Sequence, residues 1–145
     1  MAEIKHKPAF TMPMRGLLLL TGIYTSLWGA FFRWFGEEAF TWLAMEIEPV
    51  AVSGTTAYGT VGMITGIAVF LAAFYPLSWI YLIVVGIMGK LVTLTWFLTG
   101  YIGEVGWNKR SVFHVVFNEA IWLVPLSIIL YNAWEVKKFL KGNKP

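Results

Sequence analysis

The sequence predicts an all-α fold, a four-helix transmembrane bundle in an up-down-up-down arrangement. Of the 145 residues, 58% are hydrophobic and 13% are charged, whereas soluble domains carry about 25% charged residues. A chain this short cannot bury so much apolar surface inside itself, because small domains have a large surface for their volume. Four separate segments are apolar enough to cross a bilayer, and no segment alternates polar and apolar residues as a half-buried strand does.

The four predicted spans each approach the roughly 20 apolar residues that one crossing needs. They are residues 15–35, 58–75, 77–100 and 112–134 of a single integral membrane domain, residues 1–145. Basic residues precede the first span as in a signal peptide, but the apolar run continues without a small-residue cleavage site, so we expect a retained span. Tyr75–Pro76 separates the second and third spans and predicts a tight turn rather than one kinked helix, because proline interrupts the helical hydrogen bonds.

Lysine and arginine next to the spans predict the orientation, because cytoplasmic flanks are enriched in them. Seven basic residues lie on the side of the two termini and three on the opposite side, so we expect both termini in the cytoplasm. The seven are Lys5, Lys7, Arg15, Lys137, Lys138, Lys141 and Lys144, and the three are Arg33, Lys109 and Arg110. Basic residues grouped beside apolar runs favour this role in topology over a nucleic-acid partner.

The first outer loop, residues 37–57, predicts an interfacial amphipathic helix. Its apolar residues Phe40, Leu43, Ile47 and Val50 fall at helical spacing. We expect the helix to end at or before Glu48, because Pro49 follows, and its tryptophan to lie at the level of the lipid headgroups. Such a helix either caps the outer end of the bundle or offers a docking surface to a partner.

Small residues on three spans predict close helix packing, because apolar contact alone does not drive helices together in lipid. The glycines concerned are Gly22 and Gly29 on the first span, Gly62 and Gly66 on the second, and Gly86 and Gly89 on the third. These faces either pack the bundle itself or, in part, contact another subunit.

Ionisable residues inside the spans predict a polar cluster, because such residues are rare in membranes and usually face the interior of a bundle. Lys90 and Glu119 lie roughly 15 and 10 Å from the outer ends of their spans by the helical rise. We expect them to meet directly or through Asn118 or a water, and Arg33 is an equally good partner for Glu119.

The predicted cluster lines an outward-opening cavity with aromatic walls. Its polar members are Arg33, Lys90, His114, Asn118 and Glu119, and its walls are Tyr24, Trp28, Trp96 and Trp122. Two interpretations stay open. Either the cluster is a structural element that fixes the register of the helices, or it is a site for a ligand or a proton.

Several chemistries are excluded by the composition. The chain has no cysteine and two histidines, so thiol catalysis, disulfides and cysteine-ligated metals are absent, and a metal site built from histidine and carboxylate has too few ligands. His6 lies outside the spans, which argues against a bis-histidine haem. The sequence contains no P-loop, dinucleotide-binding signature or nucleophilic triad. We therefore predict no cofactor, no metal and no catalytic residue.

Four stretches together resemble a family of uncharacterised bacterial four-span membrane proteins, loosely similar to DoxX-like proteins. They are "GIYTSLWG" (22–29), "VGMITG" (61–66), "GIMGKL" (86–91) and "NEAIWLVP" (118–125). The resemblance implies the fold and a bacterial inner membrane, and it places Gly89–Lys90 and Asn118–Glu119 at the positions of polar motifs. This chain differs in having Glu119 where aspartate is commoner and Val92–Thr93 where Gly-Pro is commoner.

Three functions fit these observations. The first is a non-enzymatic accessory subunit of a larger inner-membrane complex, which suits the small size, the glycine faces and the missing catalytic apparatus. The second is a binding protein for a lipophilic molecule such as a quinone or lipid. The third is a proton-coupled membrane enzyme or transporter that uses Lys90 and Glu119.

Overall fold

The computed structural model describes residues 9–50 and 52–142, and within these ranges the chain is helical and contains no strand. The all-α prediction is therefore confirmed. The elements are α1 (Met12–Trp34), α2 (Gly36–Ala44), α3 (Thr55–Ala72), α4 (Ile80–Trp96) continued by the π-helix η1 (Phe97–Tyr101) and α5 (Ile102–Val105), and α6 (Lys109–Phe113) continued by the π-helix η2 (His114–Ala120) and α7 (Ile121–Gly142).

Three continuous helical stretches of the described chain are long and apolar enough to cross a membrane. They are Thr55–Ala72, Ile80–Val105 and Lys109–Gly142. Helix α1 has 23 residues but is not among them. Arg15 and Arg33 near its two ends lower its mean hydropathy. The membrane character that the composition predicts is thus carried by α3 and by the two long helices that follow it.

The second and third predicted spans are separate helices, as the sequence indicates. Residues 73–79 connect α3 to α4, so the turn is longer than the predicted Tyr75–Pro76 junction. The amide of Trp79 donates to the carbonyl of Tyr75 at 2.8 Å and closes this turn.

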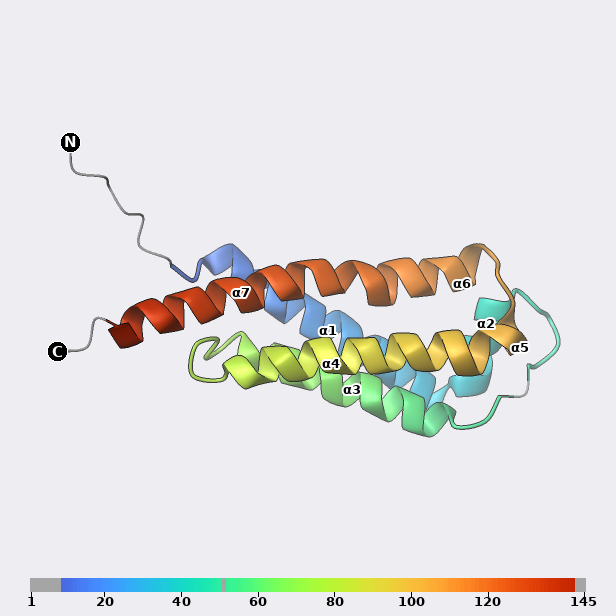
Figure 1. Ribbon diagram of the computed structural model, residues 1–145. Helices are drawn as coiled ribbons and strands as arrows, with labels where there is room; N and C mark the ends of the chain where they lie inside the picture. Colours follow the sequence, from blue (N-terminus) through green and yellow to red (C-terminus); the bar gives the residue numbers. More distant parts are fainter. Residues whose placement is uncertain (1–8, 51, 143–145) are drawn as a thin grey trace.

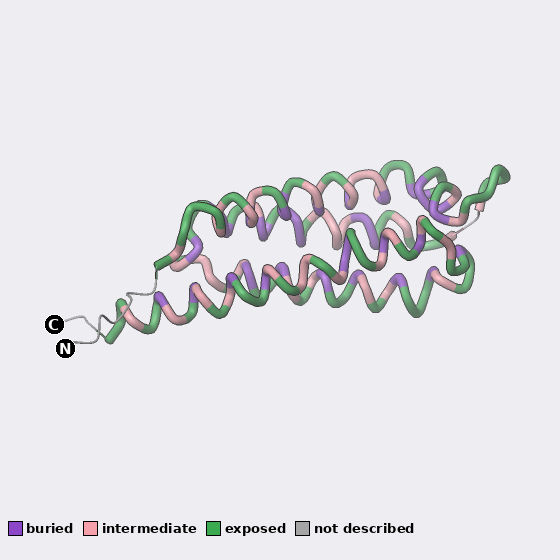
Figure 2. The backbone as a smooth tube through the Cα atoms, turned by 90° about the horizontal axis from the view of Figure 1, so that it is seen from above, coloured by how far each residue is buried: buried purple, intermediate pink, exposed green. Residues whose placement is uncertain are grey.

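The long helices lie side by side, and their buried residues line the inner sides (Figures 1 and 2). Helix α1 packs most extensively on α3, α3 on α4, and α4 on η2 and α7. Contacts between α1 and α7 are few, although the Asn132 side chain donates to the carbonyl of Ala9 at 3.1 Å near one end. The bundle therefore has one weakly packed side, which we call the α1–α7 seam.

The predicted glycines bring α1, α3 and α4 together. A Cβ atom on Gly22 would lie 2.6 Å from the backbone nitrogen of Phe70, and one on Gly66 would lie 2.5 Å from the backbone nitrogen of Ser26. Gly29 and Gly62 face each other across the same α1–α3 contact, and on α4 Gly86 and Gly89 face Val69 and Thr65 of α3. These contacts are all within the chain, so the glycine faces serve the packing of this bundle.

Helix α2 closes one end of the bundle, which we call the α2 end (Figure 1). Phe40 and Leu43 are fully buried in a cluster with residues of α1, α3, η1 and α5. The helix ends at Ala44, and Met45 takes a left-handed conformation with φ of 57°. Ile47, which is 97% exposed, and Val50 therefore lie beyond it. The predicted helical face is wrong beyond Leu43, because the helix is too short to reach those residues.

The beginning of α6 holds the C-terminal end of α2. The Asn108 side chain donates to the carbonyl of Leu43 at 2.8 Å, and the Arg110 guanidinium donates to the carbonyl of Trp42 at 3.0 Å. The same guanidinium lies 4.8 Å from the centre of the Trp42 ring. Carbonyls at a helix C-terminus lack partners within the helix; Asn108 supplies one to Leu43, and Arg110 adds a second to Trp42, whose carbonyl also accepts from the amide of Met45 at 3.2 Å.

Candidate functional site

The polar residues of the fourth predicted span lie on the π-helix η2. In an α-helix, residues five apart are rotated by about 140°, whereas the i to i+5 bonds of a π-helix bring them to nearly the same side. His114 and Glu119 are five apart, and both face the interior together with Asn118. Their exposed fractions are 1%, 6% and 2%. The wide turn thus directs three polar side chains into the bundle.

Lys90 on α4 meets η2 at the backbone of Asn118. The side chain is 2% exposed, and its ammonium donates to the carbonyl oxygen of Asn118 at 2.5 Å. The hydroxyl of Thr93, one turn further along α4, donates to the Glu119 carboxyl group at 2.7 Å. Both Lys90 and Glu119 are described by the structure, and they form no direct ion pair there. Lys90 and Glu119 thus have separate partners, the carbonyl of Asn118 and the hydroxyl of Thr93.

His114, the first residue of η2, makes polar contacts with α3 and with its own helix. Its Nε2 lies 2.9 Å from the hydroxyl of Tyr58 and 3.9 Å from a carboxyl oxygen of Glu119. Its Nδ1 lies 3.0 Å from the side-chain nitrogen of Asn118, and the hydroxyl of Tyr24 donates to the side-chain oxygen of the same asparagine.

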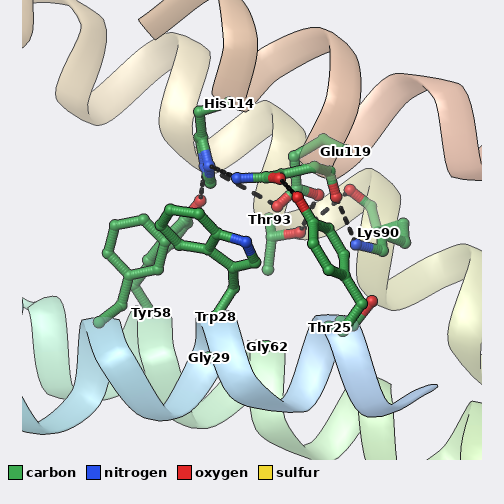
Figure 3. A pocket seen from close by; sticks show the side chains of 12 residues that line it. Thr25, Trp28, Gly29, Tyr58, Gly62, Lys90, Thr93, His114 and Glu119 are labelled. Atoms are coloured by element: carbon green, nitrogen blue, oxygen red, sulfur yellow. Dashed lines mark hydrogen bonds and ion pairs between the residues drawn. The ribbon is translucent and has the colours of Figure 1, made fainter. Parts of the chain in front are cut away.

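These side chains surround a cavity of about 20 Å³ (Figure 3). Its lining residues are Tyr24, Thr25, Trp28, Gly29, Phe32, Tyr58, Gly62, Lys90, Thr93, His114, Asn118 and Glu119. A water needs roughly 10–15 Å³ measured in this way, so the cavity has room for about one water and none for a quinone ring. The hydroxyl of Thr25 is buried and has no hydrogen-bond partner among the described residues.

The cavity does not open toward the α2 end, contrary to the prediction. The ring of Phe32 lies 5.1 Å from that of His114 and 5.2 Å from that of Phe40, and Phe97 lies 4.6 Å from His114. Aromatic packing beneath α2 therefore closes this side.

Three residues of the predicted cluster and its walls do not line the cavity: Arg33, Trp96 and Trp122. The guanidinium of Arg33 donates to the hydroxyl of Thr60 and lies 5.5 Å from the Trp34 ring. Trp96 packs edge-on against Tyr58 at 5.6 Å but does not line the cavity. The depths of Arg33 and Trp96 fit the cluster, but their rotation about the helix axis directs them away from it.

A second hollow lies on the α1–α7 seam, beside the cavity. It is an open groove of about 570 Å³. We call it the seam groove, and its lining residues are Tyr24, Phe113, Phe117, Ile121, Trp122, Val124 and Pro125. Trp122, predicted as a cavity wall, lines this groove instead and packs on Tyr24 with ring centres 5.6 Å apart.

Tyr24 lines both the cavity and the seam groove. Its hydroxyl is bonded to Asn118 in the polar cluster, while its ring contacts Trp122. One side chain of α1 thus stands between the polar interior and an apolar groove on the outside of the bundle.

Three hydroxyl-bearing members of the site, Tyr58, Thr93 and Thr25, are not among the residues that the sequence predicts for it, and neither is Phe32. Tyr58 is the first residue of its predicted span, and Thr93 is only a neighbour of the glycine face on α4. Hydroxyl residues carry little signal of a polar site, because threonine also bonds its own helix in apolar segments, as Thr21 and Thr65 do here.

Within residues 9–50 and 52–142, no group of three or more histidine and carboxylate side chains lies close enough to hold a metal ion. Comparisons with protein-family models, with curated proteins and with solved structures found no match to this chain.

Proposed function

We propose that this protein is a membrane protein that binds a lipophilic molecule in the seam groove. The observation that carries the proposal is the position of Tyr24, which lines both the apolar groove and the polar cavity. A molecule lying in this groove contacts lipid on one side and reaches the edge of a hydrogen-bonded cluster on the other. Such a place suits an amphiphile with an apolar tail and a small polar head.

The two hollows differ in what they can hold. Ligand pockets usually measure about 300–1,000 Å³, and the seam groove, at about 570 Å³, lies in this range. The polar cavity, at about 20 Å³, does not. The tail therefore occupies the groove, and the head lies at Tyr24 while the buried cluster holds this side chain in place.

A bulky residue in the groove tests the proposal. Val124 is 62% exposed and lines the groove, whereas Ile128, one turn further along α7, is 58% exposed and lies outside it. Val124→Trp is expected to reduce the lipophilic material that co-purifies in mild detergent, as measured by native mass spectrometry, and Ile128→Trp to leave it unchanged. Equal retention by both variants would contradict the proposal.

The topology forms part of the proposal. Helix α1 is an additional, fourth span, the spans run up-down-up-down, and both termini lie on the cytoplasmic side of a bacterial inner membrane, as the resemblance to the four-span, loosely DoxX-like family implies. Supporting this, α2, α5 and α6 gather at one end and the α3–α4 turn lies at the other (Figure 1). Lys137, Lys138 and Lys141 follow the apolar part of α7, while Lys5, Lys7 and Lys144 lie outside the described residues.

Single cysteines test this orientation, since the natural chain has none. Lys138→Cys is expected to be protected from an impermeant maleimide in intact cells, and Trp107→Cys to react. The reverse pattern would overturn the orientation.

A role as an accessory subunit is the second candidate. A lipid-facing hollow of about 430 Å³ on α4 favours it, because hydroxyl side chains lie among the apolar residues there. Its lining residues are Met88, Leu91, Val92, Thr95, Trp96 and Thr99. Native mass measurement after gentle solubilisation tests this role. A complex larger than the 16.4 kDa chain supports it, and a monomer argues against it.

A further inference from the structure

A further hollow lies at the α2 end of the bundle, where the helix that begins as α4 ends in α5 (Figure 1). It measures about 250 Å³, and we call it the Glu104 hollow. Its lining residues are Val52, Ser53, Trp96, Gly100, Tyr101 and Glu104. The hydroxyl of Tyr101, a residue 3% exposed, donates to the carbonyl of Ser53 at 2.9 Å and joins the loop before α3 to η1. The hollow thus has a fixed wall and one charged side chain, the exposed Glu104.

Glu104 carries its negative charge at a place where its own helix disfavours one. The continuous helix Ile80–Val105 ends one residue after Glu104, and the C-terminus of a helix has a partial negative charge that stabilises cations. Within residues 9–50 and 52–142, Glu104 forms no ion pair, and no basic side chain lines its hollow. A cation in the hollow would therefore be stabilised both by the carboxylate and by the end of the helix.

The lining of the hollow selects the kind of cation. A metal ion needs several oxygen ligands, whereas Glu104 is the single carboxylate in this lining. The rings of tryptophan and tyrosine attract organic ammonium groups that lie within about 6 Å of the ring centre, and both ring types are present here as Trp96 and Tyr101. A carboxylate beside two aromatic rings favours an organic ammonium group over a metal ion.

Trp96 connects this hollow to an apolar surface. It also lines the lipid-facing hollow of about 430 Å³ on α4, which we call the α4 hollow. The other residues of that lining are apolar or threonine, and none is charged. An alkyl chain attached to the ammonium group can therefore lie over Trp96 and along α4. Because neither hollow has a basic side chain in its lining, a phosphate next to the ammonium would gain no partner there, so the head is cationic overall.

We propose that the Glu104 hollow binds the ammonium head of a cationic amphiphile, whose alkyl chain lies over Trp96 along the α4 hollow. The site goes beyond the proposed function and is separate from the seam groove, because they share no lining residue. In the isolated chain the amphiphile covers the surface that a partner subunit would cover in a complex.

The test measures radiolabelled dodecyltrimethylammonium bound to the full chain in neutral maltoside micelles, by scintillation proximity. Two unlabelled competitors separate the parts of the ligand. Tetramethylammonium has the head without the chain, and dodecylphosphocholine has the same head and chain with a phosphate between them. We expect unlabelled dodecyltrimethylammonium to displace the probe at lower concentration than either competitor, and added salt to weaken the binding.

A pair of matched variants tests the carboxylate. Glu104→Gln removes the charge and keeps the size of the side chain, and Glu48→Gln changes an exposed acid outside both hollows. We expect Glu104→Gln to weaken binding about fivefold, the effect of one ion pair near the surface, and Glu48→Gln to leave it unchanged. Glu104 is exposed, so its replacement leaves the buried core intact.

The outcomes distinguish this site from the seam groove. Equal affinity of Glu104→Gln and Glu48→Gln would overturn the site. Equal competition by tetramethylammonium would overturn the placement of the chain, and equal competition by dodecylphosphocholine would overturn the requirement for a cationic head. Val124→Trp, in the seam groove, is expected to leave the binding unchanged. If instead Val124→Trp abolishes it and Glu104→Gln does not, the probe lies in the seam groove, and this inference fails while the proposed function stands.

Discussion

Replacing Thr93 by valine removes one hydroxyl from the polar cluster and leaves the shape of the side chain unchanged. The hydroxyl lies 2.7 Å from the carboxyl oxygen of Glu119, and the two residues are 3% and 6% exposed. Interhelical hydrogen bonds in membrane proteins contribute about 0.6 kcal/mol on average and up to about 1.7 kcal/mol. A bond of this length between two buried side chains belongs at the upper end of that range, because no solvent competes for either group. We therefore expect Thr93→Val to lower the free energy of unfolding by about 1.5 kcal/mol.

The matched control is Thr25→Val at the other threonine of the same cavity. Its hydroxyl is buried without a hydrogen-bond partner among the described residues, so the substitution removes an unsatisfied group and is expected to be neutral or stabilising by up to about 1 kcal/mol. Both variants are unfolded in detergent micelles with a denaturant, and helicity is followed by circular dichroism. Equal effects of the two substitutions would refute the hydrogen-bond assignment, because the chemical change is the same at both positions.

Three further substitutions test other parts of the structure. Lys90→Met removes the donor to the η2 backbone and is expected to lower the free energy of unfolding by roughly 1.5–3 kcal/mol. An unchanged midpoint of denaturant unfolding together with lost ligand binding would show that the cluster is not structural. Gly29→Ala places a methyl group against the α3 backbone and is expected to lower the free energy of unfolding by about 1–3 kcal/mol. Gly16→Ala, with no atom within 4 Å of the added carbon, is expected to leave it unchanged. Equal unfolding midpoints of the two variants would contradict the close packing of α1 on α3. Arg110→Met removes contacts to the end of α2, so the hydrogen exchange of the α2 amides is expected to accelerate. Lys109→Met, at the neighbouring residue, is expected to leave this exchange unchanged, and equal exchange rates in the two variants would refute the contact.

The sequence predicts the helices well because apolar length and proline are direct signals. The apolar run of residues 15–35 corresponds to α1 at Met12–Trp34, and Pro76 lies within the connection between α3 and α4. The short helix α2 is predicted in the right place and ends before Glu48 as expected, but its apolar face is predicted too long. Hydrophobic spacing continues to Val50, whereas the structure ends the helix with a left-handed residue at Met45.

The candidate site is harder to predict, because it depends on the direction of each side chain about its helix axis. Depth along a span can be counted from the sequence, and it groups Lys90, His114, Asn118 and Glu119. The direction changes at the π-helix η2, which the sequence does not reveal and which turns Glu119 to the same side as His114. Arg33 has a suitable depth but points to Thr60 on α3.

Photo-crosslinking is the most direct test of lipophile binding at the α1–α7 seam. A monoacylglycerol with a diazirine in its chain is irradiated with the protein in proteoliposomes, and the labelled peptides are identified by mass spectrometry. Ile121 and Val124 in the groove are 46% and 62% exposed, and Ile67 and Ile64 on α3, outside the hollows described above, are comparably exposed at 46% and 57%. Specific binding predicts labelling that is concentrated on Ile121 and Val124 and that an excess of the unlabelled monoacylglycerol displaces. Equal labelling of both pairs, unaffected by the competitor, would show that the groove only meets bulk lipid.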